Sequence, residues 1–391
     1  MGKGAYIWSV ENNIKTMANT DSLYIENLGP IQSAQVDFGD LTILVGPQAS
    51  GKTIFAELFK LIKDKDYILH SIEDTYKISV ADTLEDSTLD KYFGNGMHSI
   101  WNNQTIVSFN GKLFDTSELY SYKEELSNLF SIYYIPARRS SEFDEGRLKE
   151  AYEVRESPYV LREFRDLLDG FLYSLQLAAD NSLLYFNHFD AKIFGQGKIG
   201  MQKKSKSDPW RLVQEYKGSI IDYMAWSTGQ SEYAPLRIGL EDVSVNPIYD
   251  YVVIEEPEIG LHPKAIADFV KEIIKLTNKT KVIVITHSSI LLEFIWAIKS
   301  IDRTKVPTQD ISKELFKTDE QLPLNDIFDK TINTYAFVKD VDESVDVKNI
   351  SNLDAWSKED YEAKWGGLTD FATITSDFVS KYYKEDNDGH F

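Results

Sequence analysis

The chain has 391 residues, of which 42% are hydrophobic and 13% aromatic, so it can bury a substantial core and is not globally disordered. Its formal charge of −20 disfavours sequence-independent binding to a nucleic-acid backbone, because such binding needs a net positive surface. The chain has no cysteine, which excludes disulfides, zinc sites built on thiolates and cysteine nucleophiles.

No apolar run is long enough to cross a bilayer. The most apolar stretch, residues 282–298, is interrupted by Thr286, His287, two serines and Glu293. Residues 1–13 lack the apolar segment of a signal peptide. We therefore expect a soluble, cytoplasmic protein without a membrane partner.

The first half of the chain predicts strands, helices and hairpins in alternation. Residues 22–45 predict three short strands, and residues 53–64 have the apolar spacing of a helix. A buried strand that stops at Pro136 comes next. It is followed by an amphipathic helix over 157–179, which Gly170 could interrupt, and by hairpins over 192–226.

The second half predicts a parallel sheet. Residues 250–256 and 281–287 are apolar without alternation, as in strands buried on both faces, and residues 262–278 form the crossover helix between them. Residues 333–351 predict a hairpin and residues 368–384 a terminal helix.

The segment GPQASGKT has the P-loop spacing of glycine, four residues, glycine, lysine and threonine. Its glycines turn backbone N–H groups inward around an anion, and the helix that follows adds its positive end. Lys52 would reach the β- and γ-phosphates, and the Thr53 hydroxyl would bind Mg²⁺. A glycine-rich turn that binds nothing is the alternative; the flanking strand and helix favour a nucleotide. The binding residues we expect are Gly46, Pro47, Gln48, Ala49, Ser50, Gly51, Lys52 and Thr53.

Two later strands end in side chains that suit the same chemistry. Glu255 and Glu256 end the first, where a P-loop sheet places a metal-linked acid and a water-activating base. Neighbouring carboxylates raise each other's pKa, which would help one of them act as a base. The second strand ends at His287, which we expect to face the nucleotide; His262 has a weaker claim and could simply fix the loop after the acids. A solvated carboxylate pair and a structural histidine are the alternatives.

Two polar segments are more ambiguous. Ser227, Thr228, Gly229 and Gln230 stand at a predicted helix start, where they make a cap and a small anion site or an ordinary turn. The lysine-rich turn at 203–206 is a nucleic-acid contact or a solvated hairpin tip.

In this order, the motifs resemble those of ABC-type ATPases in the RecF/SMC/OLD-like branch of AAA-family proteins, particularly AriA-like ATPases of bacterial antiphage defence. Residues 46–53 resemble Walker A, STGQ resembles the ABC signature, VVIEEPE resembles Walker B with the catalytic glutamate, EIGLHP resembles the D-loop, and THS resembles the switch histidine. The resemblance implies an α/β P-loop NTPase fold with an ABC-ATPase-like head, a mixed sheet flanked by helices, and a helical and hairpin insertion between Walker A and the signature.

The resemblance further implies ATP and Mg²⁺ held in a head-to-tail dimer. Thr53 and Glu255 would bind the metal; Glu256, His287 and Lys52 would be catalytic. The binding residues of the partner copy would be Ser227, Thr228, Gly229 and Gln230. Gln48, Glu255 and Thr228 depart from the usual Asn, Asp and Gly, which predicts slow hydrolysis. No glutamine of a Q-loop can be assigned. Arg138 and Arg139 lie near the Q-loop region, or they form a plain surface ion pair.

We expect five regions: an extension at 1–21, a core lobe at 22–65, an insertion at 66–210, a second core lobe at 211–300 and an α+β tail at 301–391. No coiled coil, transmembrane module or nuclease domain is visible in the sequence. The first hypothesis is therefore an oligomeric sensor that controls a separate nuclease or toxin effector. A DNA-binding repair-type ATPase and a non-hydrolysing assembly platform are the alternatives.

Overall fold

A computed structural model describes residues 20–78, 85–120, 130–177, 183–186, 191–205, 207–246, 248–301, 308–315 and 327–382. Most of the expected N-terminal extension, residues 1–19, and parts of the expected insertion and tail lie outside these ranges. None of the helices within them combines the length and the hydrophobicity that crossing a lipid bilayer requires.

Ten strands form one mixed sheet in the order β5-β4-β1-β2-β16-β15-β3-β14-β13-β6. Five neighbours, β15, β3, β14, β13 and β6, run parallel, and the other side of the sheet is mixed. The strands are β1 (Ser22–Leu28), β2 (Ile31–Asp37), β3 (Leu41–Val45), β4 (Ile106–Phe109), β5 (Lys112–Phe114), β6 (Ile132–Ile135), β13 (Tyr251–Glu255), β14 (Lys281–Thr286), β15 (Ile332–Lys339) and β16 (Val345–Asn349).

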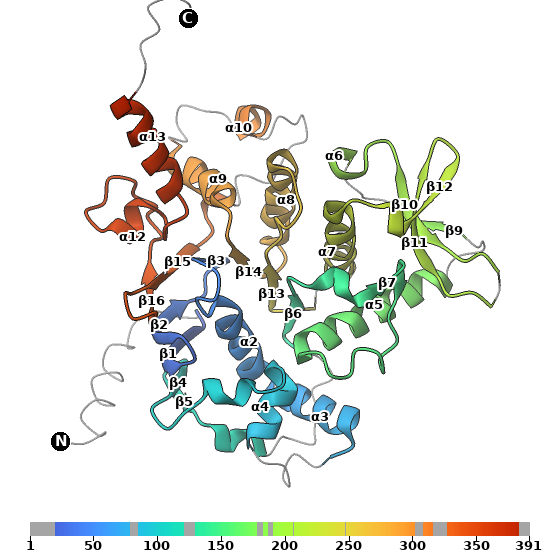
Figure 1. Cartoon of the computed structure of the whole chain (residues 1–391), viewed down its shortest axis with the longest axis horizontal. Helices are drawn as coiled ribbons and strands as arrows, with labels where there is room; N and C mark the ends of the chain where they lie inside the picture. Colours follow the sequence, from blue (N-terminus) through green and yellow to red (C-terminus); the bar gives the residue numbers. More distant parts are fainter. Residues whose placement is uncertain are drawn as a thin grey trace, which may run out of the picture.

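Helices cover both faces of this sheet (Figure 1). One face packs on α2 (Lys52–Lys63), α3 (Lys65–Tyr76) and α4 (Glu85–Phe93), through a core that includes Phe55, Ile68 and Leu89. The other face packs on α5 (Tyr159–Leu177), α7 (Thr228–Val245), α8 (Pro263–Leu276) and α9 (Ser289–Ser300). Strands β3, β6 and β13 are buried along their whole length, as expected for strands covered on both faces.

The strands and helices expected from the sequence are present, and the predicted interruption at Gly170 is wrong, because α5 continues through it. A second, antiparallel sheet orders its strands β12-β11-β10-β9, and Figure 1 shows it beside α7. Its strands are β9 (Leu183–Tyr185), β10 (Lys198–Gln202), β11 (Arg211–Tyr216) and β12 (Ser219–Asp222), and a hairpin of β7 (Phe143–Asp144) and β8 (Arg147–Leu148) lies next to it. The remaining helices are α6 (Ala191–Phe194), α10 (Thr308–Leu315), α12 (Asp360–Ala363) and α13 (Asp370–Tyr382).

The main sheet takes strands from four of the five regions expected from the sequence. Within the expected insertion, β4 and β5 lie at one edge of the sheet and β6 at the other. The hairpin expected at 333–351 forms as β15 and β16, and β15 pairs directly with β3 in the middle of the sheet. The region after α9 is therefore part of the layer that holds the P-loop, and the domain boundaries themselves stay a prediction.

A buried ion cluster joins α2 to β6 and α5. Lys60 Nζ lies 2.8 Å from Glu163 Oε2 and 3.0 Å from Asp64 Oδ2, and it donates to the Ile132 carbonyl at 2.8 Å. Burial alone would lower the pKa of Lys60, but the two carboxylates raise it overall. The cluster therefore holds the helix that follows the P-loop against β6.

We predict that Lys60→Met lowers the free energy of unfolding by about 3–5 kcal/mol, because it leaves two buried carboxylates without their cation. Urea unfolding would measure this loss. Lys63→Met is the matched control: Lys63 sits one turn further along α2 in a partly exposed pair with Asp21, and its loss should cost about 1 kcal/mol or less. Equal losses in the two variants would show that the buried cluster has no special role.

Candidate functional site

The P-loop connects β3 to α2, and its two glycines are required by geometry. Gly46 has a φ of 143°, and a Cβ there would lie 2.6 Å from the carbonyl oxygen of Phe337 on β15. Gly51 has a φ of 89°, and its Cβ would lie 2.8 Å from the side chain of Ile31. Both positions combine left-handed backbone with close neighbours, which only glycine accommodates. The loop is therefore held close to β15 and β2, which lie on the same side of β3 in the sheet.

Lys52 is buried within this loop. Its Nζ donates to the carbonyl oxygens of Gly46 at 2.9 Å and Pro47 at 2.7 Å, and to Ser50 Oγ at 3.1 Å. Burial lowers the pKa of Lys52 to about 8, although the carboxylates at the end of β13 act in the opposite direction. The loop thus surrounds a cation with neutral oxygens, and an anion that entered would meet an ammonium group with no bonded carboxylate.

Glu255 ends β13 with its side chain buried. Its Oε2 accepts from the Ala137 N–H at 3.1 Å, while its Oε1 is buried and has no hydrogen-bond partner among the described residues. Burial raises the pKa of Glu255, and a hydrogen bond with the Thr53 hydroxyl lowers it in part. Another buried acid, Glu57, sits one turn after Thr53 on α2, and burial followed by the charge of Glu255 raises its pKa well above the ordinary value.

The arrangement around Glu255 fits Mg²⁺. A carboxylate oxygen without a partner and a neighbouring hydroxyl are the hard oxygen donors that this ion takes. No group of three or more acidic or histidine side chains placed to hold a metal occurs in the ranges that the structure describes. An ion held by Thr53 and Glu255 would therefore complete its shell with phosphate and water oxygens, the usual arrangement for Mg²⁺ in nucleotide sites.

Glu256 pairs with His287, which the sequence predicted to share its site. His287 Nε2 lies 3.2 Å from Glu256 Oε1, and both side chains are partly exposed. The hydrogen bond with His287 lowers the pKa of Glu256. The expectation that the two neighbouring acids raise each other's pKa is confirmed in direction for Glu255, on which Glu256 acts in this way, and is wrong for Glu256, because its hydrogen bond with His287 outweighs the effect of burial.

Glu258 connects the two strand ends, and sequence reasoning gave it no role. Its Oε1 accepts from the Thr286 hydroxyl and from the His287 N–H, both at 2.7 Å. The signal was present, since Glu258 is the last acid of the EEPE run. Further along the same loop, His262 Nδ1 accepts from the Lys264 N–H at 3.2 Å and caps α8, so His262 fixes the loop after the acids.

The STGQ segment forms the capped start of α7. The Ser227 hydroxyl accepts from the Gln230 N–H, and Gln230 Oε1 accepts from the Ser227 N–H at 2.9 Å, which is a capping box. Gly229 lies against the loop after the acids, because a Cβ on it would be 2.2 Å from the Gly260 carbonyl oxygen. Ser227 and Thr228 remain exposed, so the free N–H end of the helix is open to solvent.

The structure does not bring this helix start to the P-loop of the same chain. Helix α7 packs beside β6, which is separated from β3 by β14 and β13. At about 4.8 Å between neighbouring strands, β6 and β3 lie roughly 14 Å apart across the sheet. Figure 1 likewise shows α7 beyond α8 and next to the small sheet. The eight P-loop residues, the two acids and His287 thus form one group, and residues 227–230 form another.

The two arginines after β6 differ from each other. Arg138 is exposed, whereas Arg139 is completely buried and donates to main-chain carbonyls, including that of Glu255 at 2.9 Å. The surface ion pair considered for Arg139 is therefore wrong.

Comparison with known proteins gives a partial match. Residues 227–293 match the family described as "AAA domain, putative AbiEii toxin, Type IV TA system". This segment includes the start of α7, both acids and His287, but not the P-loop. No curated protein matches the sequence. The match supports an AAA-type ATPase domain in this part of the chain.

Solved structures with a similar arrangement include three SMC heads, each 11% identical to this chain. One is bound to the C-winged helix domain of ScpA and has a TM-score of 0.43, covering 84% of this chain and 97% of that one. The SMC head domain from Thermotoga maritima has a TM-score of 0.36, covering 85% and 98%. The Smc head from Pyrococcus furiosus with an extended coiled coil, bound to the C-terminal domain of ScpA, has a TM-score of 0.42, covering 93% and 100%.

The predicted fold class is confirmed. The chain has a mixed α/β sheet flanked by helices, a P-loop between a central parallel strand and a helix, and helices and hairpins between that loop and α7. A P-loop between a central parallel strand and a helix, in a sheet covered by helices on both faces, is the arrangement of a P-loop NTPase fold.

We predict that nucleotide affinity falls as the pH rises through about 8. Below that pH the Lys52 ammonium is charged and attracts phosphate; above it the free protein loses this charge, so the dissociation constant should approach a tenfold increase per pH unit. A fluorescent ATP analogue titrated between pH 7.5 and 9.5 measures this. Lys52→Arg is the control, since its guanidinium stays charged and its affinity should not change over this range. A constant wild-type affinity up to pH 9.5 would contradict the assignment.

Proposed function

We propose that this chain is an ABC-type ATPase that binds ATP with Mg²⁺ between two copies arranged head to tail. The observation that supports this most is the convergence at one sheet edge of buried Lys52, the unpartnered Glu255 oxygen and the Glu256–His287 pair. The capped, exposed start of α7 lies elsewhere on the same chain, which favours its use on a second copy.

Binding begins with an exchange of partners at Lys52. A triphosphate that enters the loop offers charged oxygens in place of the Gly46 and Pro47 carbonyls that now hold the ammonium group. The ammonium donates in both cases, but only the phosphate oxygens carry an opposite charge, so the exchange favours the nucleotide. The backbone N–H groups of the loop and the start of α2 add to the same anion site.

Thr53 and Glu255 would hold Mg²⁺, which supplies charge neutralisation at the β- and γ-phosphates when bound. The main-chain N–H of Ala137 fixes one oxygen of Glu255 and leaves the other free for this role. Glu256 would orient and polarise the attacking water. Because its pKa is lowered, it is ionised at neutral pH, and its contact with His287 sets the direction of the carboxylate.

At a finer level, we propose that the oligomeric ATPase acts as a sensor that controls a separate effector protein in bacterial antiphage defence. The region after α9 supplies β15 and β16 to the ATPase sheet. No acidic group suited to a metal-dependent nuclease occurs among the described residues. The likeness of residues 227–293 to a family described as part of a type IV TA system also favours a two-component arrangement.

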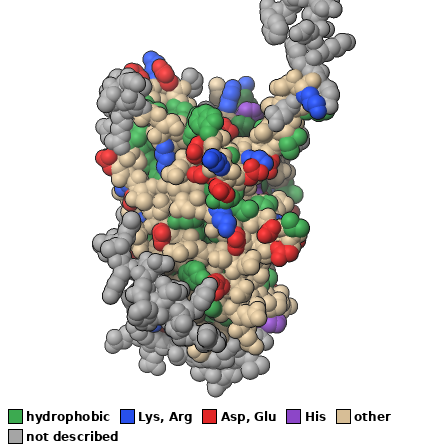
Figure 2. Space-filling model, turned by 90° about the vertical axis from the view of Figure 1, so that its left-hand side faces the viewer, with side chains coloured by type: hydrophobic (Ala, Val, Ile, Leu, Met, Phe, Trp, Pro, Cys, Tyr) green, Lys and Arg blue, Asp and Glu red, His purple; other side chains and the backbone are tan. Residues whose placement is uncertain are grey.

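Nucleic-acid binding is less well supported. Figure 2 shows acidic and basic side chains interspersed on the face that carries α13 and β16, where Lys348 pairs with Asp346 at 2.8 Å. In the expected lysine-rich turn, Lys203 lies 5.0 Å from the Trp210 ring centroid, and Lys206 lies outside the described residues. Salt-sensitive DNA binding that disappears on replacing Lys203 and Lys204 by glutamate would favour the repair-type alternative.

We predict that Glu256→Gln lowers kcat by at least 100-fold while ATP still binds, because the amide cannot polarise water as a carboxylate does. Phosphate release and analogue binding measure the two effects. Glu272→Gln on α8, far from the strand ends, is the control and should keep wild-type turnover. Turnover that persists in Glu256→Gln would refute the catalytic assignment. ATP-driven association without any wild-type turnover would instead identify a non-hydrolysing platform.

We predict that Ser227→Arg abolishes ATP-driven self-association and leaves ATP binding by the single chain within threefold of wild type. The larger, charged side chain blocks the helix start that would close on the partner's nucleotide, but it does not touch the P-loop of its own chain. Sedimentation velocity with and without ATP, in the Glu256→Gln background, measures this. Association that survives the substitution would exclude the head-to-tail arrangement.

A further inference from the structure

Arg139 binds three segments that are far apart in the sequence. Its Nε donates to the Glu232 carbonyl on α7 at 2.9 Å. Its Nη1 donates to the Glu255 carbonyl at 2.9 Å and to the Pro136 carbonyl at 3.3 Å, and its Nη2 donates to the Glu256 carbonyl at 3.2 Å. All four acceptors are main-chain oxygens, and the guanidinium is completely buried. One side chain therefore joins the signature-like helix to the turn that carries both acids.

The bonds of Arg139 fix the positions of the carbonyl groups that accept them more than they balance the charge of the surrounding acids. Burial lowers the pKa of Arg139, and the surrounding acids Glu232, Glu258, Glu255 and Glu256 raise it in part. The guanidinium nonetheless bonds to the backbone, where a planar fork fixes the direction of each carbonyl. Lysine, a point donor on a flexible stem, cannot hold the same four oxygens at once.

The first turn of α7 depends on such outside contacts. The carbonyl of Glu232 follows directly after this turn, five residues after Ser227. Pro235 lies inside the helix and has no N–H, so the helix cannot bond the Ser231 carbonyl in the regular way. A helix start with a missing internal bond is easier to displace when a ligand binds to it.

The acidic turn is sensitive to the same contacts. Glu256 has a φ of 40°, a conformation that a residue with a side chain keeps only when its surroundings impose it. Because the Glu256 carbonyl is bound by Arg139, a shift of the guanidinium rotates this residue and redirects its carboxylate. The Gly229 contact with Gly260 ties the helix start to the same loop a second time.

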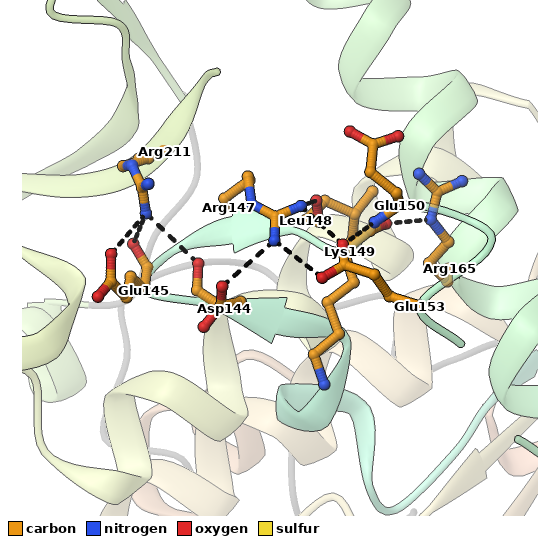
Figure 3. A network of polar contacts seen from close by, with 9 residues as sticks. All are labelled: Asp144, Glu145, Arg147, Leu148, Lys149, Glu150, Glu153, Arg165 and Arg211. Carbon is orange, nitrogen blue, oxygen red and sulfur yellow. Dashed lines mark hydrogen bonds and ion pairs between the residues drawn. The ribbon is translucent and has the colours of Figure 1, made fainter. Parts of the chain in front are cut away.

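The segment that follows the arginine is anchored at its other end. Figure 3 shows Arg147 with Glu153 and Asp144, and Arg211 of β11 with Glu145. The first two pairs close at 2.9 and 3.2 Å and the third at 3.3 Å. The β7–β8 hairpin is thus attached to the small sheet, while the residues between β6 and this hairpin pack directly on α7.

We propose that Arg139 is a positioning residue that couples contact at the start of α7 to the alignment of Glu256. This inference rests on the proposed ATPase function. When Ser227 of one copy meets the nucleotide of the other, the displacement of α7 reaches the catalytic turn of its own chain through the Glu232 and Glu256 carbonyls. Each copy therefore aligns its own carboxylate when it closes on its partner's ATP.

The test compares Arg139→Lys with Arg138→Lys, the exposed neighbour. For Arg139→Lys we expect kcat to fall at least tenfold. ATP affinity at low protein concentration should stay within threefold of wild type. ATP binding should no longer tighten as the protein concentration rises. A fluorescent ATP analogue measures this in a background carrying Glu256→Gln. Arg138→Lys should keep all three properties. Urea unfolding confirms that each variant is folded under the assay conditions.

A folded Arg139→Lys that keeps kcat and the concentration dependence within twofold of wild type would overturn the coupling, even if its unfolding midpoint is lower. If Arg139→Lys does not fold, Arg139→Gln is used instead, because its shorter amide cannot reach the Glu232 and Glu256 carbonyls at once. Its kcat should fall at least threefold, and an unchanged kcat would overturn the proposal. If the wild type has no turnover, the proposed ATPase function is wrong. The dependence of ATP affinity on protein concentration then still tests the coupling.

Discussion

Parallel pairing of β3, β14, β13 and β6 brings the carboxyl ends of four strands to one edge, and the site depends on this register. Glu255 pairs with Ile285, which pairs with Leu44, so the last residue of β13 stands level with the penultimate residues of β14 and β3. A side chain reaches only a few ångströms beyond the sheet, so a slip of one residue would turn Glu255 away from α2 to the opposite face.

Buried cations in this protein are held in two ways. Lys60 is balanced by two carboxylates and connects secondary-structure elements permanently. Lys52 and Arg139 bond to main-chain carbonyls, which are neutral and weaker partners. A cation held by neutral oxygens can exchange them for a charged ligand or transmit a movement, whereas a cation in a closed ion cluster cannot. The two kinds occupy different places. The ion cluster lies at the amino end of β6, and the carbonyl-bound cations lie at the carboxyl ends of β3 and β13.

Helix α7 packs beside β6 and the segment that carries Arg139. It is joined to the acidic turn through backbone contacts at Arg139 and Gly229, and β6 lies three strands from the β3 that leads into the P-loop. In the proposed dimer, this geometry would give one element two roles: recognition of a second copy and alignment of a carboxylate in its own chain. The proposed dimer follows from this division, because each copy has a helix start without a nearby phosphate site.

The sequence by itself determined the local features: the P-loop, the capped start of α7, the buried strands and the acids and histidine at their ends. These depend on glycine spacing, apolar periodicity and capping residues, which act over a few positions. The tertiary structure alone decided that β15 pairs with β3, that Arg139 binds four carbonyls and that Glu258 joins two strand ends. It also decided that His287 lowers the pKa of Glu256. These contacts join residues far apart in the chain, and only the packing of the sheet sets which of them meet.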